Sequence, residues 1–496
     1  MEAIFTRIDQ LIDQAIQAAL INERDRVYCR NQILGMLNMD FFIESNQDQT
    51  NKSIPGLLND ILEYAIENEV IADVLDEKEV FCANIMNCFL SKPSEISDKF
   101  YQLYQKGPEE ATNYFYQLSK DSNYIQTERI AKNIHYQTTT KYGDLDITIN
   151  LSKPEKDPEQ IKRERQMKQT INYPKCLLCA ENEGYVGRTG HPARSNHRII
   201  GLELADEDWF FQYSPYVYYN EHSIVFSKEH RPMTITKGTF ERLTSFVEQF
   251  PHYFVGSNAD LPIVGGSILS HDHYQAGNYT FAMTKAEDEF TFDLEQYPDI
   301  QAAVVRWPMS VIRLRSENRT SLVDAADLIL KNWRAYSDSS VDILAYTEDT
   351  PHNTITPIAR MRDGNFELDL VLRNNRTSEK HPDGIFHPHQ DVHHIKKENI
   401  GLIEVMGLAV LPPRLKEELE AVQAFLVDGK TNVEEYHQVW ANDIKHKYKD
   451  ITNTNVESIV HDELGKKFVT VLEDSGVFKS NSRGKAAFKR FLLSLK

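Results

Sequence analysis

The chain has 496 residues, more than a single hydrophobic core usually holds, so its length predicts two or three domains. Its net charge of −19 argues against a nucleic-acid or anionic-membrane partner, because both bind basic surfaces. Five cysteines are too few, and odd in number, for a disulfide framework, which indicates a reducing compartment. The first residues have the pattern of an amphipathic helix rather than a signal peptide, and the longest apolar stretch, about 401–412, is interrupted by Glu404. We therefore expect a cytoplasmic protein.

Residues 1–170 are predicted to form a mainly helical N-terminal domain, which begins with apolar side chains at helical spacing over residues 3–20. Near its end, alternating apolar residues follow Gly143-Asp144, which predicts a hairpin over about 135–151. The densely charged segment 153–168 indicates an exposed linker or a solvated helix at the domain boundary. Further helices are expected at about 56–68, 76–91, 95–119 and 122–132, with Pro55, Pro93 and Pro108 at plausible helix starts.

Residues 171–300 are predicted to form the first of two modules. Residues 216–227 have the pattern of two strands that meet at Asn220-Glu221, and residues 239–250 have helical spacing. A loop with Asn258 then leads to another strand. The expected order is therefore strand, strand, helix, strand.

The last of these strands carries the sequence GGSILSHDHYQAG, from Gly265 to Gly277. Alternate side chains share one face of a strand, so His271, His273 and Gln275 are expected to point the same way. Such a set suits phosphate chemistry: one imidazole can attack phosphorus, the amide can hydrogen-bond a phosphoryl oxygen, and the other imidazole can bind a metal or orient its neighbour. The alternative is a pair of strand histidines that are merely hydrogen-bonded.

Two other clusters in the first module carry candidate chemistry. Cys176 and Cys179 have a C-x-x-C spacing suited to zinc; a redox pair is the alternative, although no thioredoxin-like βαβ pattern surrounds them. Downstream, a loop with glycine and proline carries Arg188, Arg194 and Arg198, which are candidates for phosphate contact in an acidic chain. A solvated surface role is the alternative for each arginine.

Residues 301–413 repeat the pattern of the first module more weakly, which predicts a second module. His387, His389 and Gln390 echo the first histidine motif, and the remaining residues 414–496 are charged and helical in pattern. The elements expected in the second module are strands at 307–314, 342–346 and 367–372 and a helix at 321–336.

Taken in chain order, these residues resemble the galactose-1-phosphate uridylyltransferase family, a branch of the histidine-triad superfamily. The helical segment before the cysteine pair, and HDHYQ in place of HPHGQ, resemble its second, bacterial branch. The resemblance implies an α+β fold with a helical N-terminal domain and two histidine-triad-like modules, each an antiparallel sheet with packed helices. It also implies a homodimer. The residues that carry it are Cys176-x-x-Cys179, Asn220-Glu221, His230, Asn258 and His271-x-His273-x-Gln275.

The resemblance implies a reaction in which UMP passes from UDP-glucose to galactose-1-phosphate. His273 would attack the α-phosphorus and hold the uridylyl group covalently in a ping-pong mechanism, and Gln275 would hydrogen-bond the phosphoryl oxygens. A neutral imidazole suits this role, because it is nucleophilic near pH 7 without a separate base. The nucleotide-binding positions implied are Tyr218, Asn220, Glu221 and Asn258.

The resemblance also implies a structural zinc ion that would brace the strand of His273 rather than activate water. Its ligands would be Cys176, Cys179, His230 and His271. A second metal is a looser implication, and a histidine-rich turn is its alternative. The residues for that second site would be His352, His387, His389 and either Glu287 or Glu289.

The chain departs from the family pattern at several positions. Asp272 and Tyr274, expected on the strand face opposite His273, stand where the better-known branch has proline and glycine. The glutamate and tyrosine that hold the hexose in that branch fall at Ala409 and Leu408, so the sugar-binding residues cannot be carried over. A nucleotide-sugar phosphorylase or a dinucleotide hydrolase is the alternative function within the superfamily. A non-enzymatic metal-binding protein is the alternative from another class.

Overall fold

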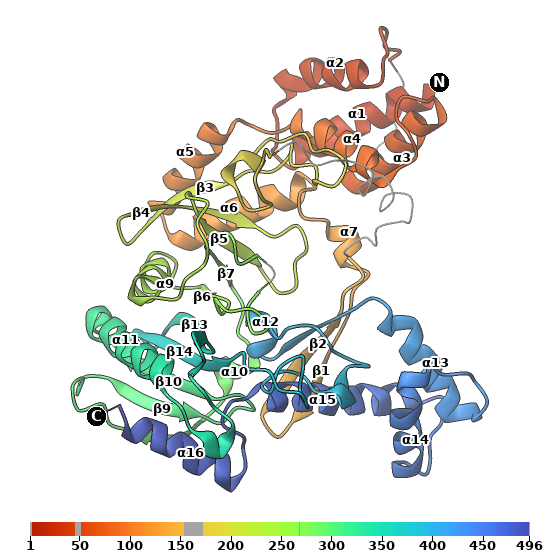
Figure 1. Cartoon of the computed structure of the whole chain (residues 1–496). Helices are drawn as coiled ribbons and strands as arrows, with labels where there is room; N and C mark the ends of the chain where they lie inside the picture. The colour runs from red at the N-terminus through yellow and green to blue at the C-terminus, as the bar shows by residue number, and fades with distance from the viewer. Residues whose placement is uncertain (1, 45–50, 153–171, 267, 496) are drawn as a thin grey trace.

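The computed structural model describes residues 2–44, 51–152, 172–266 and 268–495. Helices and mainly antiparallel sheets make up the chain, which confirms the predicted α+β class. The N-terminal helices form one end of an elongated molecule, strands cross its middle, and C-terminal helices form the other end (Figure 1). The predicted linker at 153–168 lies outside the described residues. Among the helices of the described ranges, none is both long and apolar enough to cross a membrane.

The N-terminal helices fall into two groups. Helices α1 to α4 surround a core of their own, which includes Phe5, Ile61 and Phe89. Helices α5 and α6 pack instead on the large sheet, where the ring centroids of Phe115 and Phe211 lie 5.8 Å apart. The bounds are α1 Glu2–Gln17, α2 Arg26–Met36, α3 Ile54–Glu67, α4 Leu75–Asn87, α5 Pro93–Tyr104, α6 Pro108–Asp121 and α7 Thr127–Ile130.

Most of the predicted N-terminal helices are confirmed. The single helix predicted over 95–119 is wrong, because Pro108 begins a new helix after Gly107. The helix predicted at 122–132 shrinks to the single turn of α7. Helix α2 was not predicted, since only Cys29, Ile33 and Leu34 are buried in it and its apolar periodicity is weak.

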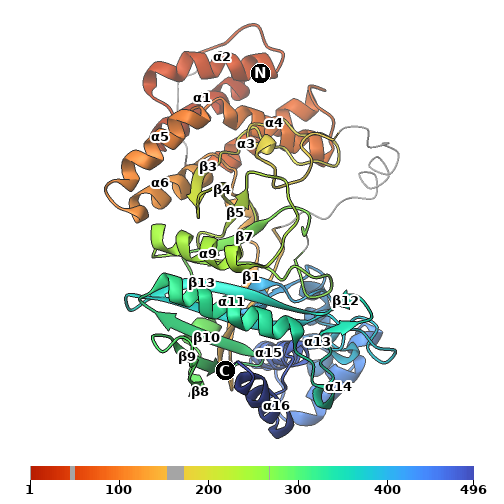
Figure 2. The same ribbon diagram turned by 60° about the vertical axis from the view of Figure 1, so that its left-hand side comes forward.

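The described residues form a ten-stranded antiparallel sheet that contains strands from both predicted modules, in the order β3-β4-β5-β7-β6-β13-β14-β10-β9-β8. Its halves join where Val255 of β6 pairs with Ala359 of β13. Helices α9 and α11 lie side by side over this sheet (Figure 2). The bounds are β3 Ile200–Leu204, β4 Glu207–Tyr213, β5 Ser223–Ser227, α9 Lys237–Gln249, β6 Phe254–Gly256, β7 His273–Gly277, β8 Asp288–Phe292, β9 Gln301–Val305, β10 Val311–Ser316, α11 Arg319–Ala335, β13 Asn353–Arg362 and β14 Asn365–Asn374.

A smaller sheet ties the predicted N-terminal hairpin to a strand far along the chain. Strands β1 (Ile134–Thr140) and β2 (Gly143–Ile149) pair as predicted, and β15 (Leu408–Leu411) runs parallel to β2. Helix α15 packs on β1. The predicted helical C-terminus is confirmed, and its helices are α13 Leu415–Asp428, α14 Gln438–Lys447, α15 Val456–Ser475 and α16 Ser482–Leu493. Shorter elements are α10 Ala282–Lys285, β11 Tyr346–Thr347, β12 Thr350–Pro351 and α12 Leu402–Val405.

Several strand predictions are wrong in part. Residues 216–221 form turns instead of a strand, and Glu221 has a left-handed φ of 55° that no strand residue adopts. The strand predicted at 307–314 begins only at Val311, because Pro308 has no amide hydrogen for strand pairing. Of the strand predicted at 342–346, only Tyr346 lies in one. The predicted domain limits of 170, 300 and 413 stay a prediction.

Candidate functional site

The His-x-His-x-Gln segment borders a cavity of about 510 Å³. Strand β7 begins at His273 and lies between β5 and β6. Gln275 pairs with a residue of each neighbouring strand, and His273 pairs with Phe226 of β5. Gly265 and Gly266 form another part of the wall, where Gly266 lies directly against the side chain of Asn258. The rest of the lining comes from the segment before and within α12: Glu398, Asn399, Gly401, Leu402, Ile403 and Glu404.

The ring of His273 is held in one tautomer. Its Nδ1 lies 2.7 Å from the backbone oxygen of His271. A carbonyl oxygen only accepts hydrogen bonds, so Nδ1 carries the hydrogen and Nε2 keeps its lone pair. Burial of the ring lowers the pKa of His273 to about 4, which keeps the imidazole neutral near pH 7. A neutral ring with a free Nε2 can act as a nucleophile.

Gln275 has an amide with an unused hydrogen-bonding atom. Its Oε1 is buried, and no partner for it exists among the described residues. An unpaired buried polar atom is costly, so such atoms often mark a position that a ligand satisfies. Since Gln275 also borders the cavity, its amide is available to a bound substrate.

Four side chains form a candidate metal centre beside this cavity. Cys176 Sγ lies 3.2 Å from His271 Nδ1, and Cys179 Sγ lies 3.2 Å from His230 Nδ1. The candidate ligand atoms of all four residues lie within 4.8 Å of one another. His271 donates from Nε2 to the Ser227 oxygen at 2.8 Å, which leaves its Nδ1 lone pair facing the two sulfurs. Two thiols and two imidazoles in this arrangement fit a closed, tetrahedral zinc site.

The metal centre and the cavity are joined through His271. Its Nδ1 faces Cys176, while its backbone oxygen holds the His273 ring. The expectation that His271 belongs to the same strand as His273 is wrong, because β7 starts at His273 and His271 lies in the bend before it. Asp272 and Tyr274 lie on the face opposite His273, as predicted, and both contact Arg242. Asp272 Oδ2 lies 3.8 Å from Arg242 Nη2, and the Tyr274 hydroxyl accepts a hydrogen bond from Arg242 Nε at 2.7 Å.

The predicted nucleotide-binding residues are only partly brought together. Asn258 borders the cavity, and its Oδ1 accepts a hydrogen bond from the Leu402 amide at 2.9 Å. Asn220 and Glu221 lie instead against Gly277, at the far end of β7. Four residues of strand separate that end from His273, which is about 13 Å. Tyr218 does not border the cavity either.

The Glu221 carboxylate already has partners within the protein. It accepts hydrogen bonds from the Tyr253 hydroxyl and from Asn220 Nδ2, the latter at 3.1 Å. These contacts, and the turn in which it lies, fix the position of the carboxylate at the end of β7.

The three predicted phosphate arginines lie apart from the His273 cavity. Arg198 is buried, and its guanidinium donates to the backbone oxygens of Ser91, Ser195 and His197 and to Asn87 Oδ1. The phosphate prediction is therefore wrong for Arg198, which links the N-terminal helices to the sheet. Arg188 pairs through its backbone with His191. Arg194 borders a different cavity.

The predicted second metal site does not assemble. His352 is bonded through both ring nitrogens, to Asn375 and Thr347. His389 lies 3.3 Å from Asp474, and Glu287 is an exposed residue 3.8 Å from Arg306. Within the described ranges, the Cys176 cluster is the one group of three or more potential ligands. The remaining candidates are also separate, since His387 contacts Asn399 and Glu289 pairs with Lys485.

Sequence reasoning missed the wall formed by residues 398–404. Glu404 is buried there, with its carboxylate 2.9 Å from Lys396 Nζ and 3.2 Å from the Gly401 amide. The sequence feature that could have indicated this wall is Glu404, a single acidic residue within an apolar stretch. By contrast, Leu408 and Ala409 lie buried in the core, so they are not sugar contacts.

Two family profiles and several proteins of known name are similar to this chain over most of its length. The family profile "Galactose-1-phosphate uridyl transferase, N-terminal domain" matches residues 19–232, and its C-terminal counterpart matches residues 246–442. A galactose-1-phosphate uridylyltransferase of Clostridium perfringens (strain 13 / Type A) is 55% identical over 98% of each chain. One of Ligilactobacillus salivarius (strain UCC118) is 55% identical over 98% of this chain and 97% of its own. The crystal structure of yeast Ap4A phosphorylase Apa2 matches 61% of this chain and 90% of its own, with 13% identity and a TM-score of 0.33.

Proposed function

The chain belongs to the galactose-1-phosphate uridylyltransferase family, and we propose that it works in two steps through a uridylyl group held on His273. The overall reaction transfers UMP from UDP-glucose to galactose-1-phosphate, giving UDP-galactose and glucose-1-phosphate. The observation that carries the proposal is the His273 ring at the edge of the cavity: its Nδ1 is bonded to the His271 oxygen, and its Nε2 has no hydrogen-bond partner among the described residues.

In the first step, the Nε2 lone pair attacks the α-phosphorus of UDP-glucose. An N–P bond forms, the bond from that phosphorus to the bridging oxygen breaks, and glucose-1-phosphate leaves with the electron pair. The ring becomes positively charged, and the hydrogen bond from Nδ1 to the His271 oxygen strengthens as it does. In the second step, a phosphate oxygen of galactose-1-phosphate attacks the same phosphorus, the N–P bond breaks, and the neutral ring returns.

Gln275 and the opposite wall supply the polar contacts of this proposal. The Gln275 amide nitrogen donates to a phosphoryl oxygen where negative charge develops, and its unpaired Oε1 is free for a substrate hydroxyl. Glu404 is a buried carboxylate on the other side of the cavity, so it is suited to accept hydrogen bonds from sugar hydroxyls. Asn258 holds the Leu402 amide and so connects the two walls.

Zinc is the metal that we propose for the Cys176 cluster. The donor set, two sulfurs and two imidazole nitrogens, is the one that structural zinc prefers. When bound, the ion would fix the position of His271 and thereby the backbone oxygen that orients His273. A homodimer and a cytoplasmic location remain predictions of the family resemblance.

The two-step route is tested by isotope exchange in the absence of galactose-1-phosphate. If the uridylyl group rests on the protein, labelled glucose-1-phosphate will be incorporated into UDP-glucose by the protein alone. A direct transfer between two bound sugars predicts no exchange until galactose-1-phosphate is added. Release of free UMP or another nucleotide product would point instead to a hydrolase or phosphorylase.

A further inference from the structure

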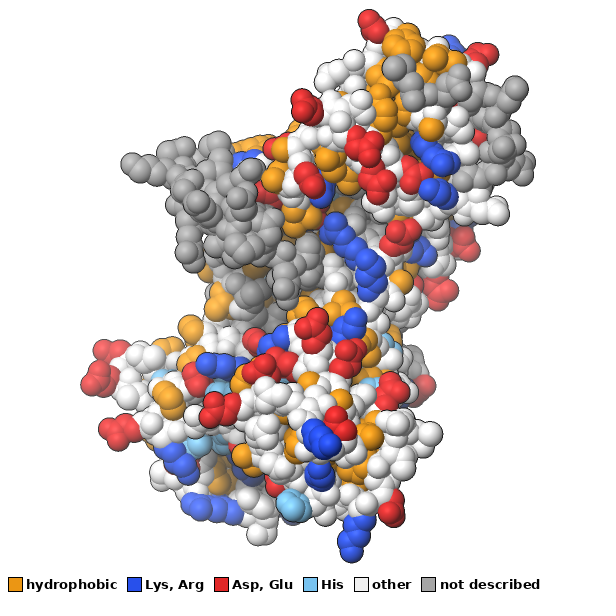
Figure 3. Space-filling view, turned by 90° about the vertical axis from the view of Figure 1, so that its right-hand side faces the viewer, with side chains coloured by type: hydrophobic (Ala, Val, Ile, Leu, Met, Phe, Trp, Pro, Cys, Tyr) orange, Lys and Arg blue, Asp and Glu red, His pale blue; other side chains and the backbone are white. Residues whose placement is uncertain are grey.

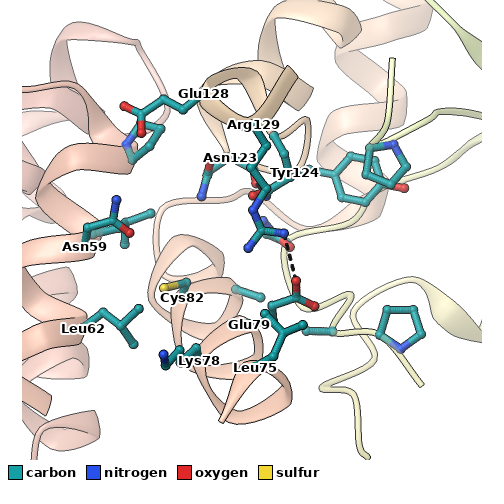
Figure 4. A pocket seen from close by; sticks show the side chains of 18 of the residues that line it. Asn59, Leu62, Leu75, Lys78, Glu79, Cys82, Asn123, Tyr124, Glu128 and Arg129 are labelled. Atoms are coloured by element: carbon teal, nitrogen blue, oxygen red, sulfur yellow. Dashed lines mark hydrogen bonds and ion pairs between the residues drawn. The ribbon is translucent and has the colours of Figure 1, made fainter. Parts of the chain in front are cut away.

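A second cavity lies where the N-terminal helices meet the sheet, and the transfer reaction does not use it. Its volume is about 380 Å³, within the usual range for small-molecule sites, which often occur at such junctions. It shares no lining residue with the His273 cavity. Helices α3 and α4 form one side, residues 123–132 another, and two loop segments next to β3 and β4, 192–196 and 215–216, close it (Figure 4).

The lining of this cavity carries a surplus of positive charge, although the whole chain has a net charge of −19. Arg129 reaches from α7 toward Glu79 on α4 and forms an ion pair with it at 3.0 Å (Figure 4). In the part of the chain that the structure describes, neither Lys132 nor Arg194 has an acidic partner. A short run of Lys and Arg side chains, with Asp and Glu side chains around it, also lies just above the waist of the molecule (Figure 3). This surplus is available to an anion.

The rest of the lining suits the body of a small organic ligand. Tyr124 is buried, and its hydroxyl has no hydrogen-bond partner among the residues that the structure describes. Burial raises the pKa of Tyr124 to about 12, so the group remains a hydroxyl that can donate. The Arg194 guanidinium lies 5.6 Å from the Tyr124 ring centroid, and Tyr216 adds a second aromatic side chain. Leu62 and Leu75 supply an apolar wall on the side of α3 and α4.

We propose that this cavity is a second binding site, for a small phosphorylated metabolite. The phosphate lies among Arg129, Lys132 and Arg194, where guanidinium groups and an ammonium group provide charge-assisted hydrogen bonds. The sugar or nucleoside part lies between the tyrosines and the apolar wall. Because the walls come from both the N-terminal helices and the loops that flank β3 and β4, the bound ligand holds these two parts together and raises the stability of the folded chain.

The test is calorimetric titration of the full chain with three probes: inorganic phosphate, UMP and glucose-1-phosphate. The cavity variant is Arg129→Gln/Lys132→Gln. Its matched control is Arg24→Gln/Lys99→Gln, which removes the same charges from exposed positions outside both cavities. Each probe also has access to the His273 cavity, so the informative quantity is the binding component that the cavity variant loses and the control keeps.

We expect the cavity variant to weaken this component at least tenfold for UMP or for glucose-1-phosphate, since charge-assisted bonds are lost. The probe that loses more identifies the ligand as a nucleotide or a sugar phosphate. Lys132→Gln alone, at an exposed position, is expected to weaken it about threefold without risk to folding. Equal binding by both double variants would overturn the proposal, as would organic probes that bind no better than inorganic phosphate. Isotope exchange by the same variants reports the His273 site separately.

Discussion

The two histidine-rich segments of the chain have similar spacing and different surroundings. In the first, His271 faces two cysteine sulfurs, and His273 borders a cavity with an Nε2 that has no partner in the described part of the chain. In the second, His389 is bonded to the Ile385 oxygen and to Asp474, and His387 to the Pro388 oxygen. A histidine motif therefore becomes a site only where another segment supplies complementary groups and leaves one ring nitrogen free.

Backbone context explains the difference. His273 begins β7, an inner strand with a partner on each side. The second segment follows β14 and contains a short 3-10 turn, Gln390–Val392, instead of a strand. Its side chains pair with the backbone oxygens of Ile385 and Pro388 and with Asp474 of α15. The two segments are therefore similar in the order of their residues but not in structure.

The largest expected difference between the segments is in transfer activity. His273→Ala removes the proposed nucleophile and should lower kcat by about 10⁴-fold or more. His389→Ala should keep activity within about twofold, because the groups that this ring contacts, the Ile385 oxygen and Asp474 of α15, do not border the His273 cavity. Steady-state assays of both purified variants check this pair. Comparable losses in the two variants would contradict the distinction between the segments.

The next expected difference is in metal content and stability. Cys176→Ser should reduce the bound metal well below that of the wild type, and should lower the free energy of unfolding by about 4 kcal/mol or more. His352→Gln should change neither quantity measurably, since His352 is bonded to Asn375 and Thr347. Elemental analysis and thermal unfolding measure the two effects. If the wild type binds a second metal ion and His352→Gln loses it, the second metal site exists, which would contradict the structure.

The smallest expected difference is between the two glutamines. Gln275→Ala should lower kcat by about 10²-fold with a smaller change in KM, because the amide acts where charge develops. Gln390→Ala should have no effect, since Gln390 is exposed and borders no part of the cavity. If Gln275→Ala raises KM and leaves kcat unchanged, the amide binds substrate without stabilising the transition state.

The elements that depend on local pattern could be predicted from sequence. The hairpin at Gly143-Asp144 and helix α9 were found because their apolar periods are clear. The spacing of Cys176 and Cys179 indicated half of the metal cluster, and the family resemblance implied the other two ligands, His230 and His271.

What could not be predicted depends on contacts between distant segments. The sequence predicted Arg198 as a phosphate ligand, because nothing in it showed that Ser91 and Asn87, far along the chain, accept hydrogen bonds from the guanidinium. Glu404 lies beside Asn258 in space but not in sequence, so no local pattern indicated that it borders the cavity.

The central claim is that the uridylyl group rests on His273, and intact-mass analysis after mixing the protein with UDP-glucose alone tests it most directly. The wild type should gain the mass of one uridylyl group, the adduct should be acid-labile and map to His273, and galactose-1-phosphate should remove it. His273→Ala should gain nothing, and His389→Ala should behave as the wild type. An unmodified wild-type protein that nevertheless forms UDP-galactose, or an adduct on any other residue, would contradict the account.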